Sequence, residues 1–143
     1  MNLPEQTILD LLEANYDLTT ETITTADITW TLQDWSEELG KYKPYVSVKM
    51  LGGTRDQPVD TLFKFNFTIQ VIWWPQHEKD APAFKALVWT IAEKLRDIVE
   101  DATLLPSGWK SMIVLRVTDA SVLAALPNVT IKQLTVQAEI DWA

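Results

Sequence analysis

The sequence predicts a two-layer α+β domain, in which a mostly antiparallel mixed β-sheet packs against one long helix and a short N-terminal helix. Residues 62–74 and 134–142 alternate apolar and polar side chains, which is the pattern of half-buried strands. Residues 81–102 place apolar side chains at intervals of three and four, which is the pattern of an amphipathic helix. A chain of 143 residues, 47% hydrophobic, can bury one sizeable core, so residues 1–143 are expected to form a single domain.

The first element in chain order is a short helix from Pro4 to about Asn15. Asn2 suits the N-cap position, and Pro4 suits the first turn, where a backbone N–H donor is not needed. Apolar residues then follow at helical spacing, at Ile8, Leu11 and Leu12. These signals predict a helix with one buried stripe.

Two strands are expected next. Ile28, Trp30 and Leu32 alternate with polar residues, as in a half-buried strand. Residues 45–51 contain β-branched side chains and also alternate in polarity. Pro44 suits the start of this second strand, because a missing N–H donor costs least there.

Gly52 and Gly53 are expected to end the strand and to open an exposed loop of residues 52–60. Loops of this kind often carry binding contacts. Arg55 and Asp56 lie in this loop, so they are candidate contact residues together with the two glycines.

Residues 62–74 form the clearest strand of the sequence. Its odd-numbered residues are apolar from Phe63 to Trp73, whereas its even-numbered residues are polar from Lys64 to Gln70. The odd-numbered face is therefore predicted to contact the core.

A long helix is predicted after this strand. Asp80 is a suitable N-cap, Pro82 fits the first turn, and the helix is expected to run to about Ala102. Its apolar stripe consists of Phe84, Leu87, Val88, Ile91, Leu95, Ile98 and Val99. We expect this stripe to pack on the sheet.

Two further strands complete the predicted sheet. The first covers residues 110–117, and residues 118–127 connect it to the second, with one helical turn near residues 122–126. The second strand turns alternate residues inward, namely Leu134, Val136, Ala138, Ile140 and Trp142.

The charges of the chain are distributed unevenly. The formal net charge is -8, which argues against ordinary nucleic-acid binding. Residues 1–40 contain no Lys or Arg, but they contain nine acidic residues: Glu5, Asp10, Glu13, Asp17, Glu21, Asp27, Asp34, Glu37 and Glu38. This segment is expected to form a solvated acidic face, with a surface that repels DNA or a basic partner as the alternative. No apolar run approaches the roughly 20 residues of a membrane-spanning helix and no signal peptide is recognisable, so a soluble, unexported protein is expected.

No catalytic motif is recognisable in the sequence. There is no cysteine, which leaves no thiolate nucleophile and no Cys-based metal site. The single histidine, His77, lies near Glu78 and Asp80, but their spacing matches no metal-ligand motif. The glycine pair 52–53 lacks the Lys and Ser/Thr of a phosphate-binding loop. We therefore expect no enzyme activity, no cofactor and no metal, with a small enzyme built around His77 and a carboxylate as a further alternative.

Two of the seven tryptophans are candidates for an interface. Trp30, Trp73 and Trp142 lie on apolar strand faces, where core packing is expected. Trp89, by contrast, falls on the polar face of the long helix, beside Lys85 and Arg96. Trp74 lies on the strand face opposite Trp73. Exposed large aromatics favour a protein interface, with a carbohydrate- or peptide-binding module as the alternative.

The order of elements resembles the tail-terminator and tail-completion proteins of long-tailed phages. The resemblance rests on an N-terminal helix of the type "ILDLLEAN", a proline-led strand "KPYVSVKML", and a long strand "FTIQVIWWP" that ends in an aromatic-proline sequence. It continues with the helix "APAFKALVWTIAEKLRDIV" and closing strands that end in "LTVQAEIDW". This is a resemblance of pattern and spacing over nearly the whole chain.

The resemblance implies a structural virion protein that is assembled in the host cytoplasm and located in the tail. Such proteins form a homo-oligomeric ring, usually a hexamer, that caps the tail tube, ends its polymerisation and contacts the head-connector protein. Subunit or partner contacts would then involve Trp74, Trp89, Lys85 and Arg96, and the loop residues Gly52, Gly53, Arg55 and Asp56.

The acidic N-terminal segment gains a role in the same interpretation. DNA would pass through the ring without specific binding, and carboxylates at Asp10, Glu13 and Asp17 would keep the lumen from adhering to phosphate.

Overall fold

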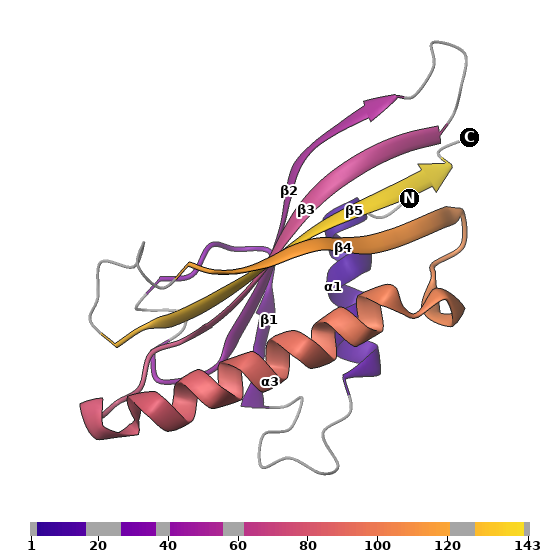
Figure 1. Cartoon of the computed structure of the whole chain (residues 1–143). Coiled ribbons are helices and arrows are strands. Elements are labelled where there is room, and N and C mark those ends of the chain that lie inside the picture. Colours follow the sequence, from indigo (N-terminus) through magenta and orange to yellow (C-terminus); the bar gives the residue numbers. More distant parts are fainter. Residues whose placement is uncertain (1–2, 17–26, 37–40, 56–61, 121–127, 142–143) are drawn as a thin grey trace.

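The computed structural model describes residues 3–16, 27–36, 41–55, 62–120 and 128–141, in which nine elements follow one another (Figure 1). They are α1 (Pro4–Asn15), β1 (Thr29–Thr31), β2 (Tyr45–Arg55), β3 (Leu62–Trp73), the 3₁₀ turn η2 (Glu78–Asp80), α3 (Ala81–Glu100), the 3₁₀ turn η3 (Ala102–Leu104), β4 (Trp109–Asp119) and β5 (Thr130–Asp141).

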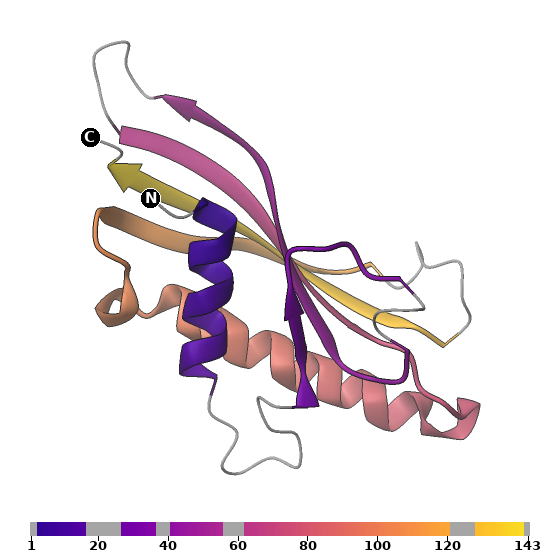
Figure 2. The ribbon, with the colours of Figure 1, turned by 180° about the vertical axis from the view of Figure 1, so that it is seen from behind.

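The five strands form one twisted sheet in the order β1–β2–β3–β5–β4. The short strand β1 pairs with β2 in parallel, and the other neighbours are antiparallel. Both helices lie on one face of the sheet, as the views from opposite sides show (Figures 1 and 2). The predicted two-layer α+β fold is therefore confirmed.

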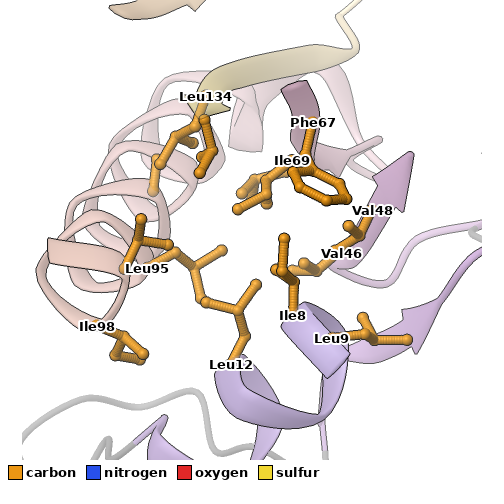
Figure 3. Packing of buried hydrophobic residues seen from close by; sticks show 14 of the residues in the cluster. Ile8, Leu9, Leu12, Val46, Val48, Phe67, Ile69, Leu95, Ile98 and Leu134 are labelled. Carbon is orange, nitrogen blue, oxygen red and sulfur yellow. The ribbon is translucent and has the colours of Figure 1, made fainter. Parts of the chain in front are cut away.

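The core lies between the helices and the odd-numbered face of β3. Phe67 and Ile69 of β3 are fully buried and face Leu95 of α3, and Ile8 and Leu12 of α1 close the same cluster (Figure 3). The predicted stripe of α3 is confirmed: Val88, Ile91, Leu95, Ile98 and Val99 are buried, and Phe84 and Leu87 pack against the same cluster. Burial of such side chains contributes about 1.5–3 kcal/mol each.

A smaller apolar cluster lies on the opposite face, at one end of the sheet. Tyr45 and Ile72 are buried there with Val129, and Trp35, Trp74 and Ile131 pack against them. The hydroxyl of Tyr45 donates a hydrogen bond of 2.8 Å to the carbonyl oxygen of Gln33. The segment that follows β1 therefore covers this end of the otherwise open sheet face.

The sequence indicated that the strand beginning at Tyr45 ends at the glycine pair, and this prediction is wrong. The ladder between β2 and β3 shifts register between Met50 and Gly52 and then continues to Arg55, which pairs with Phe63. This is a β-bulge: one extra residue is accommodated without ending the strand. Gly52 has a φ of 152°, a conformation that residues with a Cβ rarely adopt.

The ends of several predicted elements also differ from the structure. The strand expected around Trp30 shrinks to three residues, because only Thr29–Thr31 pair with β2. Leu3, not Asn2, precedes α1, and the side chain of Asp80 forms no cap because η2 leads directly into α3.

The long helix α3 is slightly shorter than its sequence predicts. The helix ends at Glu100, before the expected residue, because Asp101 is extended and starts η3. The turn expected near residues 122–126 lies outside the described residues, and so does Trp142. No helix in the described part of the chain is long and apolar enough to span a membrane.

Candidate interaction surfaces

The residues proposed from the sequence as an interface do not form one patch. Lys85, Trp89 and Arg96 lie on α3, in the helical layer, whereas Trp74 and Gly52 lie on the open face of the sheet. The sequence could not show this separation, because the two groups belong to opposite layers of the fold.

Trp89 is exposed, as its position on the helix predicts, with 42% of its surface accessible. One face of its ring covers a buried charge: the ammonium nitrogen of Lys132 lies 3.3 Å from the ring centroid. Lys132 is only 2% exposed, and the same nitrogen lies 3.5 Å from the Oδ2 atom of Asp119. Trp89 therefore has an intramolecular partner that the polarity pattern of α3 does not reveal.

The two cations on the outer side of α3 have different surroundings. Arg96 donates a hydrogen bond of 2.9 Å to Glu100 one turn later, and this contact raises the pKa of the guanidinium. Lys85 is exposed and lines an open depression of about 460 Å³ at the start of α3, together with Ala81, Pro82, Asp119, Asn128, Val129 and Thr130.

Trp74 belongs to a basic aromatic patch that we define as Lys41, Tyr42, Lys43 and Trp74. The rings of Tyr42 and Trp74 are 5.2 Å apart, and the ammonium of Lys41 lies 5.1 Å from the Tyr42 centroid and 6.0 Å from that of Trp74. Lys41 also pairs with Trp74 through a backbone bridge. The main chain of Tyr42 is in the left-handed region, with a φ of 61°, which is rare for a bulky residue.

The strain at Tyr42 has a structural cause. The bridge to Trp74 fixes Lys41, and Pro44 is buried before β2 begins, so the chain must reverse direction within two residues. The left-handed conformation makes this reversal and brings the Tyr42 ring against Trp74. Backbone strain of this kind is typical of functional surfaces, where the surrounding structure maintains it.

A shallow groove crosses the open face of the sheet. It has a volume of about 690 Å³ and is lined by Leu51, Gly52, Asn66, Leu115, Arg116, Thr135 and Gln137. Leu51 and Leu115 occupy the register shifts of β2 and β4, and both are more than half exposed, at 58% and 51%. Two amide side chains of neighbouring strands lie in its lining, where Nε2 of Gln137 donates a hydrogen bond of 3.5 Å to Oδ1 of Asn66.

Three other candidates from the expected loop are Gly53, Arg55 and Asp56. Gly53 and Arg55 belong to β2 by their backbone pairing, opposite Phe65 and Phe63. Asp56 lies outside the described residues.

The acidic candidates lie on α1. Asp10 and Glu13 are exposed, and Asp10 accepts a hydrogen bond of 2.8 Å from the amide of Gln6. Gln6, Asp10 and Glu13 recur at helical spacing and form one stripe of α1, and Leu3, 61% exposed, directly precedes this helix. Asp17 lies outside the described residues.

The metal-ligand candidates in the described ranges are His77 and the acidic residues. His77 is exposed in the turn before η2, and no group of three or more His, Cys, Asp or Glu residues could hold a metal ion among the residues that the structure describes. Burial raises the pKa of the Tyr45 hydroxyl, but this group stabilises the second apolar cluster.

Sequence reasoning missed the basic aromatic patch and Lys132. Lys132 could have been found, because it occupies the inward-facing series of β5 that contains Leu134 and Val136. Nothing in the sequence indicated that Tyr42 would lie against Trp74. No protein-family model matches the sequence, and neither does any curated protein.

Proposed function

We propose that this chain is a structural virion protein that self-assembles into a ring capping the tail tube of a long-tailed phage. In this role it ends tube polymerisation and provides the surface to which the head-connector protein binds. DNA passes through the ring without being bound specifically.

The open sheet face is the observation that supports this proposal most directly. Helices cover one face of the sheet, whereas the other carries a groove with Leu51 and Leu115 at its rims and amide groups on its floor. Ile113, 48% exposed, adds to the apolar surface of β4. Exposed apolar side chains with a polar rim are typical of protein interfaces.

The alternative from the sequence, a carbohydrate- or peptide-binding module, is less well supported. Sugar recognition by tryptophan requires a free ring face for stacking. Lys132 occupies one face of Trp89, and Tyr42 packs against Trp74. These contacts reduce the aromatic surface available to a sugar and favour the assembly role.

Native mass spectrometry over a range of protein concentrations, followed by negative-stain imaging, tests the proposal. A discrete ring-sized oligomer that binds the ends of isolated tail tubes is expected. A protein that stays monomeric at every concentration and leaves tube ends free would overturn it. A glycan array read by tryptophan fluorescence tests the alternative.

A substitution at the groove makes the test specific. Leu115→Lys places a charge at the exposed rim and is expected to weaken assembly or tube binding at least about tenfold. Thr118→Lys adds the same charge to an exposed position of the same strand, outside the groove lining, and serves as the matched control.

A further inference from the structure

We infer that the basic aromatic patch of one copy binds the acidic stripe of α1 on a second copy. The stripe consists of Gln6, Asp10 and Glu13, and Leu3 lies directly before its helix. The inference rests on the proposed self-assembly and names two surfaces that meet.

Charge is the first argument. Residues 41–55 contain Lys41, Lys43, Lys49 and Arg55 and no acidic residue, whereas residues 1–40 contain nine acidic residues and no basic one. In the part of the chain that the structure describes, neither Lys41 nor Lys43 forms an ion pair, and Glu13 forms none either. Complementary charges on two surfaces accelerate their encounter and fix their orientation.

Shape is the second argument. The acidic stripe spans about 10 Å of helix, at 1.5 Å per residue from residue 6 to residue 13. Leu3, which precedes the helix, is an exposed apolar side chain that the rings of Tyr42 and Trp74 could cover. The patch thus offers an aromatic surface for Leu3 and two ammonium groups for Asp10 and Glu13, and Trp and Tyr are enriched in interface hot spots.

Position is the third argument. In both ribbon views α1 lies toward the end of the sheet where the chain termini lie (Figures 1 and 2). Trp74 follows the end of β3 that leads into the first turn of α3, at the other end. The two surfaces therefore belong to different parts of the molecule. A contact between unlike surfaces is heterologous, and it generates a ring where the rotation between copies closes.

Crosslinking between two single-cysteine variants tests this contact, since the natural chain contains no cysteine. Ala14→Cys lies beside Glu13, and Gln76→Cys lies two residues after Trp74; both positions are exposed and uncharged. An equimolar mixture treated with a short bis-maleimide is expected to give a 14–76 crosslinked dimer. Ala14→Cys mixed with Ser107→Cys, an exposed residue away from the patch, is the matched control.

A charge exchange supplies an independent measurement. Lys41→Glu with Lys43→Glu is expected to weaken association at least about tenfold, and so is Asp10→Lys with Glu13→Lys. Mixing the two double variants is expected to restore association. Circular dichroism of each variant alone shows whether it has kept its fold.

The outcomes separate the inference from the proposed function. A ring that gives no 14–76 crosslink and tolerates both charge reversals overturns the contact and leaves the proposed function in place. A 14–76 crosslink in a species that is not a ring supports the contact and contradicts ring formation. A monomer that gives no crosslink above the control overturns both.

Discussion

The ammonium of Lys132 lies 3.3 Å from the centroid of the Trp89 ring, although the two residues belong to different layers of the fold. Lys132 projects from the inward face of β5 and is almost completely buried, while Trp89 covers it from α3. A buried ammonium is costly unless it is paired, and here the indole and the carboxylate of Asp119 both face it. Trp89 therefore stabilises the monomer, whatever contacts it makes in an assembly.

A double-mutant cycle on this pair measures its strength. Trp89→Leu is expected to lower the free energy of unfolding by about 1–2 kcal/mol, because it removes the ring and exposes the ammonium. Lys132→Met is expected to be nearly neutral, since an apolar residue of similar volume replaces a buried charge. Urea unfolding of both single variants and the double variant should give a coupling of about 0.5–2 kcal/mol. Lys85→Met, at an exposed lysine one turn before Trp89, is the control. A coupling of zero between Trp89 and Lys132 would show that the ring does not stabilise the buried ammonium.

Removal of a core side chain from β3 should cost far more. Phe67 is fully buried between the helices and the sheet, so Phe67→Ala is expected to lower the free energy of unfolding by about 3–5 kcal/mol. The exposed neighbour Asn66→Ala should stay within about 0.5 kcal/mol of the wild type. Denaturant unfolding of both variants makes the comparison, and equal losses would show that the odd-numbered face is not the core.

Alkaline pH should weaken the second apolar cluster through Tyr45. Burial raises the pKa of its hydroxyl above the ordinary value of 10.0; the charge of Asp34 adds to the increase, and a hydrogen bond with Thr31 opposes it. A raised pKa means that the folded state retains the proton more tightly than the unfolded state does. Stability from this group is therefore complete below pH 10.0 and is lost as the pH rises through the folded-state pKa.

Tyr45→Phe isolates this contribution. The variant lacks the hydrogen bond to Gln33 and is expected to be less stable at neutral pH by about 1 kcal/mol. Its unfolding free energy should then decline less between pH 9 and pH 11.5 than that of the wild type, in roughly the range where tyrosine ionises. Parallel declines in the two proteins would assign the alkaline loss to other groups.

Acid should affect the junction between α3 and η3 through Asp101. The hydroxyl of Thr103 donates a hydrogen bond of 2.6 Å to the Asp101 carboxylate, and the backbone N–H of Thr103 donates another of 2.9 Å. Both hydrogen bonds lower the pKa of Asp101, and the one from the hydroxyl has the larger effect. Their stabilisation is present above the unfolded-state pKa and disappears as the pH falls through the lower, folded-state value.

Thr103→Val removes the hydroxyl bond and keeps the backbone one. The pKa of Asp101 is expected to rise toward its ordinary value in this variant, as measured by carboxyl-carbon NMR titration. Thr90→Val, on the exposed side of α3, should leave it unchanged. An Asp101 titration that is identical in all three proteins would exclude the hydroxyl as the cause.

The layers of the fold were predictable because they follow from periodicity. The alternation in β3 and the three- and four-residue spacing in α3 reflect burial on one side, and the structure buries those same residues. Residues 4–15 were also assigned correctly, since Pro4 in the first turn and the spacing of Ile8 and Leu12 fix that helix.

The exceptions arise where pairing between distant strands determines the local structure. The glycine pair 52–53 favours a loop by composition, but hydrogen bonds to β3 hold it in β2 as a bulge. The contacts of Tyr42 with Trp74 and of Lys132 with Trp89 each join residues more than 30 positions apart. No local pattern encodes such contacts, so the candidate interface could be predicted only as separate residues and not as surfaces.

The position of β5 has a consequence for how the protein forms. This strand comes last in the sequence but lies between β3 and β4, and it pairs with both along their length. During synthesis β4 lacks its sheet neighbour until β5 has left the ribosome, although α3, which precedes β4, already offers Met112 an apolar surface. Long-range pairings of this kind slow folding. Nascent chains that end before Thr130 are therefore expected to expose to chaperones the unpaired edges of β3 and β4 and the part of α3 that packs on β5.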